Sequence, residues 1–517
     1  MLDSVLHEAD HLRESTPSEL LTTLRTLRAE LTTEAAGRFR DWRQYISRPR
    51  FAGSALNLAH YLALRRRDLR PLQRVLMRYG LSSLGRLESR VLVTLDSVAD
   101  VLEPAATDQR VDSSRWPPSA GRFFRGEERL AHNATTLFGP EPGGQPVRIL
   151  VTLGREAADD PHYVPRLVRA GADAVRINCA HDNAAVWSAM VAHTRAARKK
   201  LGRNIPVLMD IAGPKIRTSE VRQPNNASGL KEGDRLLLLP TPALLKVADK
   251  IAVRATCEPG TVLRKLRPGA EVAMDDGKLS GVVEAVRPNG GVVVLVQQTK
   301  PDGVKLKPRK GLNFPGTELD LDPLTAKDRA DLDFVATHAD LIGYSFVQRG
   351  EDVARLQNEL AARRPTDWTQ IGLIAKIETH HAVQNLPEII VRAAGRQPFG
   401  VMIARGDLAV EIGFARLAEM QEQILWLCEA AHVPVVWATQ VLEGMVKSGL
   451  PTRGEMTDAA MAVRAECVML NKGPNLPKAI HALDGLLQRM AEHQSKKTSQ
   501  MRMLMSFRDH AERNEVG

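Results

Sequence analysis

Eight short apolar runs, each containing β-branched residues, follow one another from residue 147 onward in this chain of 517 residues. Segments of helical length separate most of them, for example DPHYVPRLVRAGAD at 160–173. Strand–helix units in series are typical of an α/β fold, and eight of them predict a (β/α)8 TIM barrel. The runs are VRILVTL (147–153), AVRINCA (174–180), PVLMDIAG (206–213), LIGYSFV (341–347), IGLIAKIE (371–378), FGVMIARGD (399–407), PVVWATQ (434–440) and CVMLNKG (467–473).

The gap between the third and fourth runs is too long for a single helix. Residues 219–309 are rich in Val, Gly and Pro, and they contain alternating stretches such as GVVEAV and GGVVVLV. Short alternating runs separated by turn residues predict strands. We expect a small β-barrel lid domain inserted after strand 3, with the main barrel formed by residues 147–218 and 310–490.

The flanking regions differ in composition from the barrel. In residues 1–103, Leu, Val and Met recur at spacings of three and four with arginines between them, which predicts an α-helical N-terminal region. Residues 104–146 are rich in Pro, Gly and Ser and are predicted to be a linker. Residues 491–517 are predicted to be a polar C-terminal tail.

Charge and apolar content limit the class of protein. The net charge of +10 is spread thinly along the chain, which suits anionic metabolites at least as well as a nucleic acid. No run approaches the roughly 18 apolar residues of a membrane helix, and the N-terminus carries acids where a signal peptide carries basic residues. We expect a cytoplasmic protein without nucleic-acid or membrane partners. Scattered cysteines predict reduced thiols at Cys179, Cys257, Cys428 and Cys467.

Polar side chains gather at the ends of the predicted strands, where barrel enzymes carry their reacting groups. A single charged residue at such a place is more often part of a structural salt bridge. Seven residues from five strands, converging on one mouth, predict a reaction site instead. They are Arg176, Asn178, Asp210, Lys376, Glu378, Arg405 and Asp407.

The pattern around Lys376 predicts a divalent-metal site. Lys376 and Glu378 are two apart on one strand and therefore point to the same face, and Asp407 ends the next strand. Two neighbouring carboxylates can share one ion, and hard oxygen ligands suit Mg²⁺ or Mn²⁺. Lys376 would add a fixed positive charge beside a phosphoryl group or an enolate. A structural Lys–Glu–Asp ion-pair cluster is the alternative interpretation.

The stretch RGDLAVEI (405–412) is predicted to turn from a strand end into a helix. The amides near Gly406 and Asp407 would then be free to receive a substrate carboxylate. Thr439, at the end of the seventh strand, could donate its hydroxyl to that carboxylate or help to relay a proton.

These residues lie in motifs that resemble those of pyruvate kinase. The motifs occur in the family's order and at sensible spacing over residues 147–488. They are VRINCAH, DIAGPKIRT, MDDGKLS, KGLNFPG, LIAKIETH, VMIARGDLAVEI, VVWATQVLEGM and PTRGEMTDAAMAV.

The resemblance implies a phosphoryl transfer from phosphoenolpyruvate to ADP. It implies that Glu378 and Asp407 hold the essential Mg²⁺ or Mn²⁺, and that Lys376 stabilises the transferring phosphoryl group and the enolate. The implied contacts to phosphoenolpyruvate are Arg176, Lys376, Gly406, Asp407 and Thr439. Asn178, His181, Arg217 and Lys310 would lie on the nucleotide side, and Asp276 in the lid would close over the cleft.

One departure from the family concerns its monovalent-cation site. Asn178 and Asp210 are retained, but Ala180 and Ile211 replace a serine and a threonine, and Lys215 replaces a glutamate. The ammonium of Lys215 could place a positive charge where potassium would lie, so activity without K⁺ is predicted. Alternatively, Lys215 pairs with a nearby carboxylate.

Other departures leave room for competing hypotheses. Changes at 154–156, Ala212 and 471–474 fall on the nucleotide side, and the family's C-terminal allosteric domain has no counterpart after Gln488. A homo-oligomeric pyruvate kinase is the leading hypothesis. A lyase or aldolase that uses a metal-bound enolate, and a catalytically weak phosphoenolpyruvate-binding sensor acting through the N-terminal helices, remain open. Retention of the acid–metal machinery argues against the sensor, and the lid together with Lys376 argues against the aldolase.

Overall fold

The fold is built on a closed barrel of parallel strands in a computed structural model. The structure describes residues 15–81, 83–107, 117–141, 143, 145–224, 229–246, 249–496 and 498–499. The strands follow the order β1-β15-β14-β13-β12-β11-β3-β2 around the barrel, and every neighbouring pair is parallel. The predicted TIM barrel is confirmed. Its strands are β1 (Arg148–Thr152), β2 (Ala174–Asn178), β3 (Val207–Ile211), β11 (Leu341–Tyr344), β12 (Gly372–Ile377), β13 (Phe399–Ala404), β14 (Val435–Ala438) and β15 (Cys467–Leu470).

Helices surround the barrel because each one buries an apolar stripe against the strands. Several begin at side-chain caps: Asn183 accepts a hydrogen bond from Val186 N at the start of α11, and Thr325 forms a capping box at the start of α12. The helices are α9 (Glu156–Asp159), α10 (Tyr163–Arg169), α11 (Ala184–Leu201), α12 (Ala326–His338), α13 (Gly350–Arg363), α14 (His380–Gln384), α15 (Leu386–Ala394), α16 (Arg405–Ile412), α17 (Phe414–Ala430), α18 (Glu443–Ser448), α19 (Arg453–Met461) and α20 (Leu476–Ala491).

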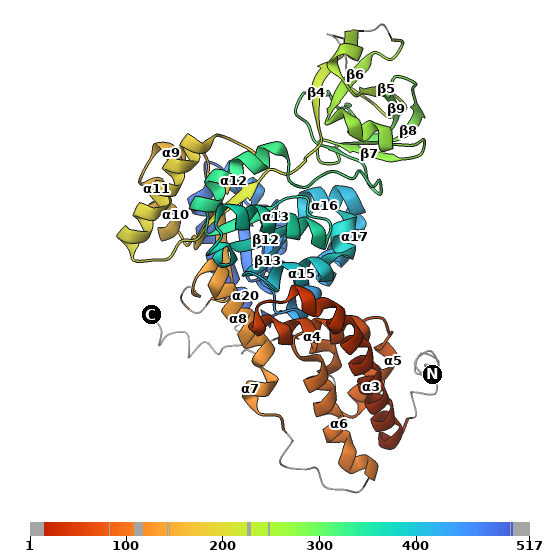
Figure 1. The fold of residues 1–517 in the computed structure, drawn as a ribbon, viewed down its shortest axis with the longest axis vertical. Helices are drawn as coiled ribbons and strands as arrows, with labels where there is room; N and C mark the ends of the chain where they lie inside the picture. The colour runs from red at the N-terminus through yellow and green to blue at the C-terminus, as the bar shows by residue number, and fades with distance from the viewer. Residues whose placement is uncertain are drawn as a thin grey trace, which may run out of the picture.

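A second sheet is inserted between β3 and β11. These two barrel strands pair directly, with Gly343 opposite Asp210 and Tyr344 opposite Ile211, so the chain between them leaves the barrel and returns. The inserted sheet has its own apolar core and stands beyond one end of the barrel (Figure 1). Its strands, in the order β10-β7-β8-β9-β5-β6-β4, are β4 (Arg217–Arg222), β5 (Arg235–Leu239), β6 (Val253–Glu258), β7 (Glu271–Met274), β8 (Leu279–Val286), β9 (Val292–Thr299) and β10 (Leu312–Asn313).

The N-terminal region is helical, as predicted, and it packs at the end of the barrel opposite the inserted sheet (Figure 1). Buried leucines at helical spacing, such as Leu20, Leu24, Leu27 and Leu31, form its core. Its helices are α3 (Pro17–Trp42), α4 (Pro49–Leu64), α5 (Arg70–Arg78) and α6 (Val91–Thr107).

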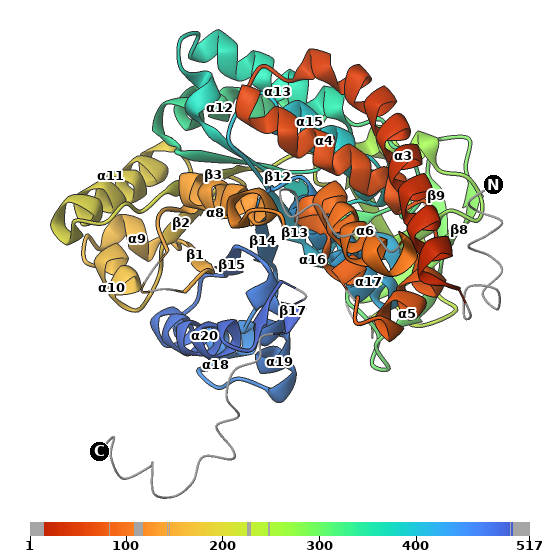
Figure 2. The ribbon, with the colours of Figure 1, turned by 90° about the horizontal axis from the view of Figure 1, so that it is seen from below.

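The segment predicted as a linker, 104–146, contains helices. It holds the end of α6, α7 (Ala120–Phe123) and α8 (Arg125–Phe138), while residues 108–116, 142 and 144 lie outside the described part. Leu130, Ala134 and Leu137 lie on one buried face of α8, at helical spacing. Seen from below, α8 crosses the end of the barrel (Figure 2). Local packing therefore prevails over the many Pro and Gly residues that flank this helix.

Leu137 closes the bottom of the barrel. It belongs to the cluster of buried side chains inside the strand ring. A Cβ on Gly372 of β12 would come within 2.9 Å of Leu137 Cδ2, and a Cβ on Gly400 of β13 within 3.1 Å of Leu137 Cδ1. Because these two glycines have no side chain, Leu137 can fill the space beside them.

Buried polar contacts fasten the N-terminal region to the barrel. The ring of His432 lies between Ser54 Oγ, 2.8 Å from Nδ1, and Ser89 O, 2.9 Å from Nε2. Burial, with Arg129 nearby, lowers the pKa of His432 to about 4. Asn57 Nδ2 donates to Ala430 O at 2.8 Å. This interface holds a neutral histidine.

Three further findings complete the fold. Cys179, Cys257, Cys428 and Cys467 are all free and buried, as expected. No helix within the described ranges has both the length and the apolar character needed to cross a bilayer. Residues 494–495 and 498–499 of the predicted tail form a short antiparallel hairpin, β16 (Gln494–Ser495) and β17 (Thr498–Ser499).

Candidate active site

Lys376 is the centre of a polar cluster at the C-terminal ends of the barrel strands. Its Nζ lies 2.7 Å from Ser345 Oγ, 3.0 Å from Glu378 Oε1 and 3.5 Å from Asp210 Oδ2. Burial acts to lower the pKa of Lys376, but Asp210 and Glu378 outweigh it and the pKa is raised. Lys376 therefore keeps its positive charge at the mouth of the barrel.

Arg176 joins the same cluster from β2. Its Nε donates to Asp210 Oδ2 at 2.9 Å, Nη2 contacts the same oxygen, and Nη1 lies 3.2 Å from Thr152 Oγ1. Burial acts to raise the pKa of Asp210, yet Lys376 and Arg176 together keep this pKa below its ordinary value. One buried carboxylate thus orients two cations toward the mouth, an arrangement suited to an anionic substrate.

Glu378 and Asp407 are near enough to affect each other. Burial raises the pKa of Glu378, and the negative charge of Asp407 raises it further, whereas Lys376 lowers it. Glu378 Oε2 also accepts a hydrogen bond from Phe346 N at 2.6 Å. Two carboxylates that repel each other fit a hard divalent ion, which would relieve this repulsion. Within the described residues no third acid, histidine or cysteine joins them, so water and substrate would complete the coordination.

Lys215 pairs with Asp407. Its Nζ lies 2.7 Å from Oδ1 and 3.1 Å from Oδ2, as the alternative interpretation of this lysine expected. The other two residues of the predicted monovalent-cation site make different contacts. Asn178 Oδ1 accepts a hydrogen bond from Ala180 N at 3.1 Å, and Asp210 binds the Arg176–Lys376 cluster.

Hydrogen bonds join the start of α16 to Thr439, at the end of β14, and form a corner. Gly406 N donates to Thr439 Oγ1 at 3.2 Å, and a Cβ on Gly406 would come within 3.3 Å of Thr439 Cγ2. Thr439 has a φ of +65°, which is unusual for a β-branched residue. Arg405 holds this conformation by donating to the carbonyl of Thr439 and pairing with Asp458. The corner brings a hydroxyl and a helix N-terminal amide together, but the Gly406 amide donates to that hydroxyl and is therefore not free, contrary to the prediction from the sequence.

Part of the predicted nucleotide side lines a cavity of about 430 Å³. His181 and Arg217 face it, and burial, with Lys472 nearby, lowers the pKa of His181. Among the described residues, no carboxylate lines this cavity, so the cavity favours an anion. The lining residues are Ala180, His181, Ala212, Gly213, Lys215, Arg217, Arg309 and Lys327.

The remaining predicted residues lie in or beside the inserted sheet. Lys310 Nζ lies 2.8 Å from Asp275 Oδ1, in the turn between β7 and β8. The predicted lid residue, Asp276, is exposed in that turn.

The inserted sheet touches the barrel at α16, which sequence reasoning missed. Asn313 Nδ2 of β10 donates to Glu411 Oε1 at 3.2 Å, and burial raises the pKa of Glu411 to about 7. A Cβ on Gly277 would lie 3.6 Å from a ring carbon of Phe414, just after α16. The helix that carries Asp407 is therefore also the contact surface for the inserted sheet.

Ser345 and Phe346 are two further site residues that sequence reasoning missed. Both follow β11, and they contact Lys376 and Glu378 respectively. A serine at the end of the fourth apolar run, LIGYSFV, was the available signal. At the end of a predicted strand, an uncharged hydroxyl is a weaker sequence signal for a functional residue than a charged side chain.

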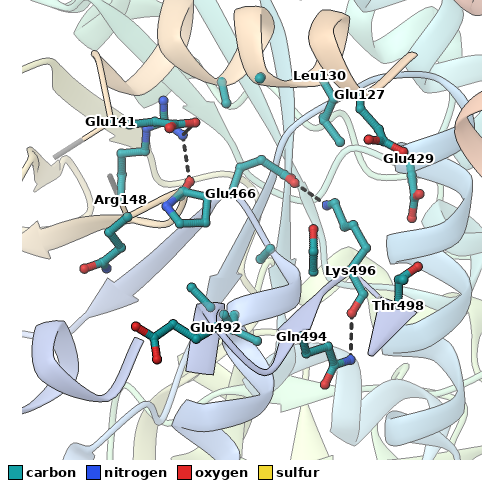
Figure 3. A pocket seen from close by; sticks show the side chains of 18 of the residues that line it. Glu127, Leu130, Glu141, Arg148, Glu429, Glu466, Glu492, Gln494, Lys496 and Thr498 are labelled. Carbon is teal, nitrogen blue, oxygen red and sulfur yellow. Dashed lines mark hydrogen bonds and ion pairs between the residues drawn. The ribbon is translucent and has the colours of Figure 1, made fainter. Parts of the chain in front are cut away.

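A larger cavity lies away from these residues, between α8, the start of β1 and the β16–β17 hairpin (Figure 3). Its volume is about 1070 Å³. Charged side chains in its wall pair with each other. Lys496 pairs with Glu466 (Figure 3). Arg90 pairs with Glu127. It contains none of the strand-end residues, so size alone does not identify the reaction site.

Comparisons with known proteins agree with the barrel fold. The family model "Pyruvate kinase, barrel domain" matches residues 145–474. The pyruvate kinase of Geobacillus stearothermophilus is 35% identical over 327 residues, which are 63% of this chain and 52% of that one. The pyruvate kinase of Methylorubrum extorquens is 34% identical over 370 residues, 71% of this chain and 72% of that one.

A solved structure shares the fold. The pyruvate kinase of Cryptosporidium parvum superposes with a TM-score of 0.59 at 27% identity, covering 69% of this chain and 70% of that one. The chain spans about half the length of the Geobacillus relative. The match thus concerns the barrel and its insertion.

Proposed function

Because the chain belongs to the pyruvate kinase family, we propose that it transfers the phosphoryl group of phosphoenolpyruvate to ADP, giving ATP and, after protonation of the enolate, pyruvate. The observation that carries the proposal is the buried cluster in which Asp210 and Glu378 hold Lys376 charged beside Arg176. A cation held in place where negative charge develops lowers the barrier without reorganising during the reaction.

Glu378 and Asp407 would hold Mg²⁺ or Mn²⁺. Their fit rests on their oxygen donors and on the mutual repulsion that helps to raise the pKa of Glu378. When bound, such an ion supplies positive charge to the oxygens of the phosphoryl group and of the substrate carboxylate.

The chain's own groups would bind and orient phosphoenolpyruvate. Arg176 presents a guanidinium fork to the phosphoryl oxygens, and Lys376 places its ammonium against the negative charge that grows on the enolate. Gly406 N and the hydroxyl of Thr439 would seat the carboxylate. The Thr439 hydroxyl would also help to relay the proton that the enolate carbon takes up.

The phosphates of the nucleotide would enter the cationic cavity beside His181 and Arg217. The proposal includes Asn178 and Lys310 on the same side, with Asp276 carried over the cleft by the inserted sheet. The absence of carboxylates from the lining of this cavity supports the assignment.

We also propose that the reaction needs no potassium. Lys215 carries a tethered positive charge into the active site through its pair with Asp407, at 2.7 Å. A free monovalent cation would then have less to contribute.

A coupled assay for pyruvate tests the proposal. Purified protein is given phosphoenolpyruvate and a panel of nucleoside diphosphates, with Mg²⁺ or Mn²⁺, and with tetramethylammonium or K⁺ as the monovalent cation. We expect pyruvate to form only when a divalent ion is present, at similar rates with either monovalent cation. Tight phosphoenolpyruvate binding without turnover on any nucleotide would favour the sensor instead, and strong activation by K⁺ would refute the role given to Lys215.

A further inference from the structure

We propose that Ser345 is a positioning residue of the phosphoryl-transfer site, which fixes the ammonium of Lys376 in its working position. The inference rests on the proposed function. The Ser345 side chain is buried, with 1% of its surface exposed, and its Oγ lies 2.7 Å from Lys376 Nζ.

The direction of each hydrogen bond follows from the partners. Ser345 Oγ is also 2.7 Å from the carbonyl oxygen of Ile211. A carbonyl can only accept and an ammonium can only donate, so the serine donates to Ile211 and accepts from Lys376. Asp210 Oδ1, at 3.3 Å, is a more distant competitor for the same hydrogen. The hydroxyl proton of Ser345 thus points toward Ile211 O, and a lone pair of Ser345 Oγ faces the ammonium of Lys376.

Rigid elements hold the serine in place. Ser345 directly follows β11, and the preceding residue, Tyr344, pairs with Ile211 of β3 in the barrel. Gly213, with a φ of +67°, packs against it so closely that a Cβ there would lie 2.9 Å from Ser345 Cβ. Both the serine and its acceptor are therefore anchored to neighbouring strands rather than to a loose loop.

The next residue completes the arrangement. Phe346 has a φ of +56°, and its amide donates to Glu378 Oε2 at 2.6 Å. Left-handed backbone at a bulky residue is costly and persists only where the surrounding structure holds it in place. The Ser345–Phe346 pair thereby holds both Lys376 and Glu378, whose charged atoms are 3.0 Å apart.

A lysine at this place needs a neutral acceptor. Its ammonium lies between the carboxylates of Asp210 and Glu378, and its flexible stem allows it to move toward either one. The hydroxyl of Ser345 balances these attractions from a third direction. Without it, we expect the ammonium to shift toward one carboxylate and lose its alignment with the substrate.

Ser345→Ala tests the role by steady-state kinetics. Misplacement of a catalytic group by about 1 Å can cost roughly 100-fold in rate, so we expect kcat to fall about 10- to 100-fold. Both KM values should stay within about threefold, because the alignment matters most in the transition state. Ser345→Thr, which restores a hydroxyl, should recover most of kcat. Thr194→Val is the matched control, since Thr194 is also buried but, among the described residues, its hydroxyl bonds to Met190 O of its own helix.

A second readout does not depend on turnover. In the ligand-free protein, the rate at which a small acylating reagent labels Lys376 is followed by mass spectrometry. Loss of one hydrogen bond to the ammonium should speed labelling about three- to tenfold in Ser345→Ala, and not in Thr194→Val. If the wild type forms no pyruvate, the proposed function fails, while labelling still decides the role of Ser345. The inference would be overturned if a folded Ser345→Ala protein were labelled at the wild-type rate and kept a kcat within about twofold of the wild type.

Discussion

At the mouth of the barrel, three carboxylates each lie against a cation. Asp210 holds Arg176 and Lys376, Glu378 holds Lys376, and Asp407 holds Lys215. Paired in this way, the buried charges are tolerated before any ligand arrives. The pairing also means that an incoming ion or phosphate must compete with a side chain for each partner.

The Lys215–Asp407 pair leads to a prediction about metal affinity. Lys215→Met should free Asp407 and tighten Mn²⁺ binding several-fold, since partly exposed ion pairs are worth roughly 0.2–1 kcal/mol. Isothermal titration with Mn²⁺ measures it. Lys327→Met is the control, because Lys327 lines the same cavity but pairs with Asp331. An unchanged Mn²⁺ affinity in Lys215→Met would mean that the lysine does not compete.

Substitutions of Lys376 and Glu378 should impair different properties, namely turnover and metal binding respectively. Lys376→Met removes the charge placed for the transition state and should lower kcat by about 100- to 1000-fold or more while Mn²⁺ still binds. Glu378→Gln should weaken Mn²⁺ binding by at least about tenfold, because a neutral amide is a poorer ligand. Kinetics and Mn²⁺ titration on the same preparations separate the two effects. Equal loss of metal binding in both variants would contradict the assignment.

Charged residues were easier to predict than their partners. The strand-end pattern brought Lys376, Glu378 and Asp210 to one place, and the structure puts them in contact. The partner of Lys215 lies 192 residues away in sequence, which spacing alone could not resolve. Ser345 was missed because its role depends on hydrogen-bond direction, which only coordinates reveal.

At the scale of elements, α8 has an unexpected place. The barrel strands were predictable because continuous apolar runs of this length suit strands covered on both faces. Helix α8 was not, because its short apolar stripe lies among Pro, Gly and Ser residues that favour irregular structure. Helix α8 is stabilised by its contact with the bottom of the barrel, where Leu137 packs against Gly372 and Gly400.

Shortening Leu137 should therefore destabilise the barrel itself. Leu137→Ala leaves a cavity between β12, β13 and α8, and we expect a loss of about 2–5 kcal/mol in the free energy of unfolding. Urea denaturation followed by circular dichroism measures it. Leu450→Ala, at a leucine that is 73% exposed, should change stability by less than about 0.5 kcal/mol. Comparable small losses in both variants would show that Leu137 does not seal the barrel.

At the scale of the whole molecule, the barrel carries additions at both ends. The inserted sheet stands over the mouth, and the N-terminal helices cover the opposite end (Figures 1 and 2). The latter are attached partly through His432, which is 2% exposed. The sequence predicted the helices but not their position, because the contacts come from residues far apart in the chain.

This attachment should weaken in acid. The pKa of His432 is lowered to about 4, mainly by burial, so between about pH 4 and 6.5 the unfolded state binds more protons than the folded state. Stability must then fall as the pH falls through this window, by about 2 kcal/mol from pH 6.5 to 5 for this histidine. Buried His60, with a pKa also near 4, adds to the effect.

Denaturation at about pH 7 and 5 tests the linkage. His432→Gln should be less stable than the wild type near neutrality but lose less stability on acidification. His493→Gln, at an exposed histidine, should retain the full wild-type dependence. Parallel pH profiles for the wild type and His432→Gln would contradict the linkage.

Lys215 lies on the strap between the last residue of β3, Ile211, and the first residue of β4, Arg217. Its grip on Asp407 therefore ties the root of the inserted sheet to the barrel rim. Outward movement of that sheet would pull the ammonium from the carboxylate, and a divalent ion bound by Asp407 would loosen this contact in turn. Movement of the inserted sheet and binding of the proposed metal would then be thermodynamically linked.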